Sequence, residues 1–174
     1  MRTLIPSTAA VVLLLGSCGP SVERPPPGST CLDFQALTPF PQTFAGPAFT
    51  IPPLRFINPT HNGAATAITL EDRAEDQDGR PELSVSVSRN TGTFTPLIVE
   101  FPRRAFPNGV KVVYVTLRHS YSAAVTAQNA NGGVVATASL PTQHTRALLT
   151  LEGRGITRLE FQASETLLYE ICWQ

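Results

Sequence analysis

Residues Leu83-Ser84-Val85-Ser86-Val87-Ser88 alternate apolar and polar side chains without interruption. This period of two is typical of a β-strand with one buried and one solvated face. Long helices are not expected in this chain, because prolines recur from Pro39 to Pro141 and leave few stretches long enough for several helical turns. The sequence therefore predicts a domain built from strands.

Similar strand patterns follow on both sides of this stretch. Two glycine-containing segments, 129–133 and 153–155, each separate a pair of predicted strands, and the first contains an Asn-Gly pair suited to a hairpin turn. Eight to ten short strands with frequent turns predict an all-β, two-sheet antiparallel β-sandwich of the jelly-roll kind. The further strands are predicted at 64–70, 94–101, 110–117, 123–128, 134–140, 147–152, 156–162 and 167–173.

The N-terminus has the pattern of an export signal. Arg2 is followed by a short apolar stretch that ends at Gly16, and Pro6 interrupts it, so it is too short for a membrane-spanning helix. Residues Leu15-Gly16-Ser17-Cys18 resemble a bacterial lipobox, which implies that residues 1–17 are removed and that Cys18 is acylated. The alternative is an ordinary secretory signal in which Cys18 plays no part.

The resemblance also bears on location. It implies a cell-envelope protein held to the membrane through the lipid on Cys18, and Gly19 favours the outer membrane if the cell has two membranes. Residues 18–30 are rich in proline and poor in apolar side chains, so they are predicted to form a flexible, semi-extended tether that holds the domain about 30 Å from the lipid surface. The domain itself is predicted to span residues 31–174.

Cysteine counting agrees with the lipobox. Three cysteines in an exported chain leave one unpaired, and acylation of Cys18 removes the odd one. Cys31 and Cys172 then stand at the two ends of the domain, where an oxidising compartment permits a disulfide. Two buried free cysteines are the alternative.

The opening Cys31-Leu32-Asp33-Phe34, which is followed by a Gly-x-x-Phe turn at 46–49, resembles the start of secreted bacterial jelly-roll domains, and residues 155–161 and 165–173 resemble their final strand pair. Residues 123–151 resemble the penultimate part of carbohydrate-binding-module-like sandwiches, where a similar sequence forms a hairpin. The resemblance implies that the first and last strands are neighbours, as a Cys31–Cys172 bridge requires. Gln35 departs from the pattern, because many relatives have glutamate at that place.

Charge excludes some classes of partner. The chain has 13 basic and 13 acidic residues, and removal of Arg2 with the signal leaves 12 against 13. The arginines are scattered and Lys111 is the single lysine, so nucleic-acid binding and a basic membrane-binding patch are not expected.

Metal and cofactor sites have little support in the sequence. The acidic run 71–82 lacks the ligand spacing of a calcium-binding EF-hand, and a solvated loop is the simpler interpretation. His61, His119 and His144 stand far apart, without the spacing of a zinc site. We expect no metal and no cofactor.

Catalytic patterns are equally weak. His119-Ser120 lacks a nucleophile elbow, and Glu160, Glu165 and Glu170 match no glycosidase motif although they could form a carboxylate pair. No catalytic residue is therefore assigned.

Aromatic side chains are the remaining binding candidates. Tyr and Trp can stack on sugars, and the residues in question are Tyr114, Tyr121, Tyr169 and Trp173. Trp173 follows Cys172, so packing against the disulfide is the favoured role for it. The resulting hypothesis is a noncatalytic binding or structural module that recognises a glycan or a cell-envelope protein. The alternative is a polysaccharide-directed hydrolase on the same scaffold.

Overall fold

The computed structural model describes residues 23–71, 82–85, 95–119, 123–140, 146–163 and 166–174. These residues form strands and one short 3-10 helix, η1 (Phe34–Ala36). The strands are β1 (Thr30–Asp33), β2 (Gln42–Phe44), β3 (Ala48–Ile51), β4 (Leu54–Ile57), β5 (Thr60–His61), β6 (Ala64–Ala65), β7 (Ile68–Glu71), β8 (Glu82–Val85), β9 (Leu97–Glu100), β10 (Val110–His119), β11 (Ala123–Asn129), β12 (Val134–Leu140), β13 (Ala147–Ala163) and β14 (Thr166–Trp173).

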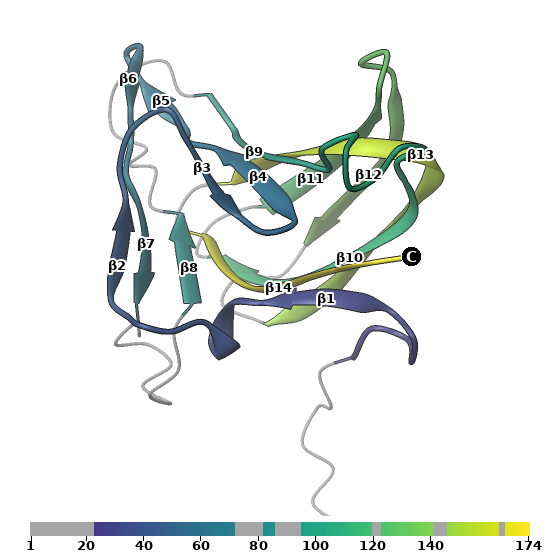
Figure 1. Ribbon diagram of the computed structural model, residues 1–174, viewed down its shortest axis with the longest axis horizontal. Helices are drawn as coiled ribbons and strands as arrows, with labels where there is room; N and C mark the ends of the chain where they lie inside the picture. Colours follow the sequence, from purple (N-terminus) through teal and green to yellow (C-terminus); the bar gives the residue numbers. More distant parts are fainter. Residues whose placement is uncertain (1–22, 72–81, 86–94, 120–122, 141–145, 164–165) are drawn as a thin grey trace, which may run out of the picture.

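The strands form one large antiparallel sheet that curls into two layers (Figure 1). Its hydrogen-bonded order is β2-β7-β8-β14-β10-β13-β9-β4-β3, with β1 beside β14, β11 beside β13 and β12 beside β11. Strands β5 and β6 form a separate pair. The prediction of an all-β, antiparallel fold is confirmed.

Strand β13 connects the two layers. Its first part, 147–152, pairs with β10, and its last part, from Ile156 onward, lies between β11 and β9. The expectation that Gly153-Arg154-Gly155 separates two strands is wrong, because one strand continues through the glycines. Gly155 has a φ of +68°, a value that glycine adopts without steric cost, and this allows the change of direction.

On the other side, the layers meet through aromatic rings. Phe44 of β2 stacks on Phe49 of β3 at 4.2 Å between ring centroids, and Phe49 stacks on Phe56 of β4 at 4.9 Å. Phe34 of η1 meets Phe56 edge to face. Buried Asn58 fixes the β2–β3 connection, because its Nδ2 donates hydrogen bonds to the carbonyl oxygens of Phe44 and Gly46.

The two terminal strands lie side by side, as the jelly-roll resemblance implied. Strand β1 pairs with β14, with Cys31 directly opposite Cys172, and the two cysteines form a disulfide. The predicted bridge is confirmed. Leu32 and Phe34 point into the core on either side of Asp33, so the start of the domain is held by packing as well as by the bridge.

An irregularity in β14 determines which of its side chains lie on the outer face of this layer. Thr116 of β10 pairs with Glu170, but the next residue of β10 pairs with Leu168, so Tyr169 is an inserted bulge residue. Leu168 and Ile171 belong to the main core cluster, whereas Glu170 and the buried side chain of Tyr169 lie outside that cluster. The bulge therefore places two consecutive side chains away from the core.

Candidate functional site

The predicted aromatic residues do not form an open platform in the described part of the structure. Trp173 is 8% exposed and packs edge to face against Phe101 and Phe106. It therefore points into the core and not, as the sequence suggested, against the disulfide. Tyr114 and Tyr169 are also buried. Tyr121 lies outside the described residues.

The candidate carboxylates and histidines are dispersed. Glu160 lies in the part of β13 between β11 and β9 and forms a 2.7 Å ion pair with Arg158, whereas Glu170 lies in β14, opposite Thr116 and Asp33. Glu165 and His144 lie outside the described residues, as does the acidic run from 72 to 81. His61 is in β5 and His119 ends β10. Glu160 and Glu170 therefore do not supply the carboxylate pair that the hydrolase hypothesis requires.

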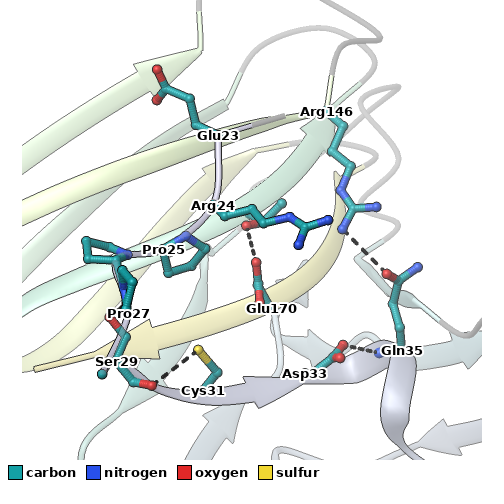
Figure 2. Close-up of a pocket in the computed structure, with 13 residues that line it drawn as sticks. Glu23, Arg24, Pro25, Pro27, Ser29, Cys31, Asp33, Gln35, Arg146 and Glu170 are labelled. Atoms are coloured by element: carbon teal, nitrogen blue, oxygen red, sulfur yellow. Dashed lines mark hydrogen bonds between the residues drawn. The ribbon is translucent and has the colours of Figure 1, made fainter. Parts of the chain in front are cut away.

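The described residues form a different site, a polar groove on the outer face of β1, β10 and β14 (Figure 2). The N-terminal segment Glu23–Ser29 lies over this face and encloses a volume of 710 Å³. Besides this segment, the groove is lined by Cys31, Asp33, Gln35, Thr116, Arg146 and Glu170.

Glu170 lies at the floor of the groove. The hydroxyl of Thr116, which is 1% exposed, donates a 2.8 Å hydrogen bond to Glu170 Oε1. The other carboxylate oxygen, Oε2, lies 3.7 Å from the sulfur of Cys172. Thr116 thus orients the carboxylate beside the disulfide.

Arg146 and Gln35 form one wall. The guanidinium carbon of Arg146 lies 4.0 Å from the ring centroid of Tyr169, a cation–π contact. Arg146 Nη2 donates a 3.4 Å hydrogen bond to Gln35 Oε1. Asp33 caps η1 by accepting a hydrogen bond from the backbone N–H of Gln35, which fixes the residue at this wall.

Two donors of this wall have no partner within the described structure. Arg146 Nε and Gln35 Nε2 are buried, and neither donates a hydrogen bond to a described residue. A buried polar group without a partner costs free energy, which a bound acceptor would recover. Figure 2 shows the Arg24 and Arg146 side chains extending into the same groove, with Gln35 and Glu170 below them.

A tight turn holds the N-terminal segment in place. Gly28 has a φ of +88°, and both the backbone N–H and the hydroxyl of Ser29 donate to the carbonyl of Pro26. Gln174 Nε2 in turn donates a 3.1 Å hydrogen bond to Ser29 Oγ. Residues 23–29 of the predicted tether therefore lie against the domain.

Few features of the sequence indicate this site. Arg24, Thr116 and Arg146 belong to no motif, and Gln35 stood out only as a departure from the jelly-roll pattern. The sequence matches no protein family model and no curated protein. Among the described residues, no helix has the length and apolar character needed to cross a membrane.

Proposed function

We propose that this chain is a noncatalytic, lipid-anchored module of the cell envelope that binds an envelope protein in the groove between residues 23–29 and the outer face of β1, β10 and β14. In a cell with two membranes, we expect it on the outer membrane. Three features support the proposal: the lipobox-like N-terminus, the place of the groove relative to Cys18, and the chemistry of its lining.

The groove would lie close to the lipid surface. Only five peptide units separate Cys18 from Glu23, and an extended chain spans at most about 3.6 Å per residue, or about 18 Å in all. Because Glu23–Ser29 lie against the domain, a lipid on Cys18 would hold the groove within roughly this distance of the membrane. The partner would then be a membrane-proximal component.

The buried donors of Arg146 and Gln35 that have no partner among the described residues carry the binding part of the proposal. Carbonyl and carboxylate oxygens of a polypeptide would accept from them, and Glu170 and Asp33 offer acceptors on the same surface. A glycan is a weaker fit, because Tyr114, Tyr169 and Trp173 leave no open ring for sugar stacking.

The test is affinity capture with the lipid-anchored protein from envelope extracts, combined with a glycan array. Replacing Arg146 by Ala removes charge-assisted hydrogen bonds worth about 1.5–3 kcal/mol each, so recovery of a specific envelope protein should fall about tenfold or more. Arg154→Ala is the matched control, since Arg154 is exposed and lines a different surface.

The two readouts distinguish the outcomes. Specific capture that depends on Arg146 but not on Arg154 supports the proposal, provided that both variants keep the circular dichroism spectrum of the parent. Arg146→Lys, which keeps the charge but not the fork of donors, should recover only part of the binding. Equal capture by all variants, or binding to glycans alone, would reject a protein-binding groove.

A further inference from the structure

A carboxylate lies beside the disulfide at the floor of the groove. One ligand atom from each of Cys31, Cys172 and Glu170 falls within 4.8 Å of the other two. Glu170 Oε1 accepts the hydrogen bond from Thr116, and Oε2, 3.7 Å from the Cys172 sulfur, accepts none from an N–H or O–H group of the described residues. Two sulfurs and one oxygen are a ligand set for a borderline-soft divalent cation.

We propose that Cys31, Cys172 and Glu170 form a redox-gated binding site for Zn²⁺ or a similar cation. The disulfide closes the site, and its reduction opens it. This inference goes beyond the proposed function, because it requires neither a protein partner nor a lipid anchor.

The distances fit a tetrahedral ion. With Zn–S near 2.3 Å and Zn–O near 2.1 Å, the sulfur and oxygen of a tetrahedral site lie about 3.6 Å apart. The separation between Cys172 Sγ and Glu170 Oε2 is already 3.7 Å. After reduction, the two sulfurs would need to lie about 3.8 Å apart, again from tetrahedral geometry. Side-chain rotation alone can reach this ordinary nonbonded separation.

The backbone would keep the two thiols together without the bridge. Strand β1 pairs with β14 at four successive positions, and Leu32 and Phe34 anchor β1 and η1 in the core. Cys172 is fully buried, whereas Cys31 is exposed at the groove. A cation could therefore enter from the groove, and a fourth, open position would remain for water.

A dithiol can act as the reductant that opens the site. Two electrons from the dithiol break the Cys31–Cys172 bond, the dithiol itself becomes a disulfide, and its two protons pass to the cysteine sulfurs. Binding of the cation then releases both protons, because thiolate is the ligand form. Glu170 binds as a carboxylate, and Thr116 continues to hold its other oxygen.

The experiment uses Co²⁺ as a spectroscopic probe on the full chain carrying Cys18→Ser, so that no third thiol contributes. After reduction by a phosphine, which adds no thiol, we expect one Co²⁺ per chain with a thiolate-to-metal charge-transfer absorption that added Zn²⁺ removes. The oxidised protein should show no such band. Absence of the band in the reduced protein, or equal binding by the oxidised protein, would overturn the proposal.

Substitution of the carboxylate tests the third ligand. Glu170→Gln should weaken Co²⁺ binding by at least the 10- to 100-fold that is typical when a metal site loses a supporting group. Glu152→Gln is the matched control, because Glu152 is an exposed carboxylate of β13 that lines a different surface and is not one of the three clustered ligands. Circular dichroism of each reduced variant checks that it is folded. Unchanged affinity in folded Glu170→Gln would exclude the carboxylate and overturn the site as proposed.

Discussion

Two consecutive residues of β14, Tyr169 and Glu170, determine contacts at the groove. The bulge at Tyr169 turns Tyr169 and Glu170 to the outer face, where one meets Arg146 and the other meets Thr116. In a regular strand, consecutive side chains point to opposite faces, so one of the two would have entered the core. A local insertion therefore provides both the cation–π contact and the floor carboxylate.

The Cys31–Cys172 bridge gives a prediction at the same scale. The cysteines are 141 residues apart in sequence, and closing so long a loop removes much of the entropy of the unfolded chain. Cys31→Ser should lower the free energy of unfolding by about 2–5 kcal/mol, measured by urea denaturation of the exported protein. Thr30→Ser, at an exposed neighbouring position of β1, should change it little. Equal stability of the two variants would contradict the role given to the bridge.

At the scale of elements, β13 gives the clearest lesson about what sequence can predict. The sequence pattern correctly predicts strand structure at 147–152 and 156–162 and a hairpin at 129–133 between β11 and β12. It also predicts a break at the glycines 153 and 155, because glycine is common in turns. Whether such a segment turns back or continues depends on partners that are distant in sequence, here β10, β11 and β9.

Because of the bend in β13, alanine should destabilise the fold to different extents at two glycines that have similar backbone conformations. Gly109 and Gly132 have φ values of +67° and +77°, so a side chain is disfavoured at both. A Cβ at Gly109 would lie 2.6 Å from the carbonyl oxygen of Ile156 and 2.7 Å from the carbonyl carbon of Gly155, whereas a Cβ at Gly132 would meet nothing within 4 Å.

Gly132→Ala should therefore cost only the conformational term, about 1–2 kcal/mol. Gly109→Ala should cost a further 1–3 kcal/mol, because the backbone of β13 must shift to relieve the overlap. Thermal or urea unfolding of both variants measures the difference. If the two alanine variants are equally stable, the close approach of Gly109 to the bend does not exist in solution.

At the scale of the whole molecule, the groove shows why the candidate site was not predicted although much of the fold was. The strands can be predicted from the local alternation of apolar and polar residues. The terminal disulfide can be predicted from the number and position of the cysteines. The groove combines an N-terminal segment with residues 31, 33, 35, 116, 146 and 170, which only the completed fold brings together. Its N-terminal part looked like a free tether, because its composition offers almost nothing to bury. A hydrogen bond from the side chain of the last residue, Gln174, to the hydroxyl of Ser29 connects this segment to the domain.

Attachment of the whole molecule to a membrane is the final prediction. If Cys18 carries the lipid, Cys18→Ala should abolish membrane association, because acyl chains contribute about 0.8 kcal/mol per buried methylene and the sequence predicts no basic membrane-binding patch. The variant should still form the Cys31–Cys172 bridge, since the domain does not depend on the anchor. Fractionation of cells with a salt wash, followed by non-reducing mass mapping, measures both effects.

Ser17→Ala keeps a small residue before the cysteine and should remain in the membrane fraction. Salt-resistant retention of the Cys18→Ala protein would mean that another part of the chain binds the membrane, and the lipoprotein assignment would then be wrong.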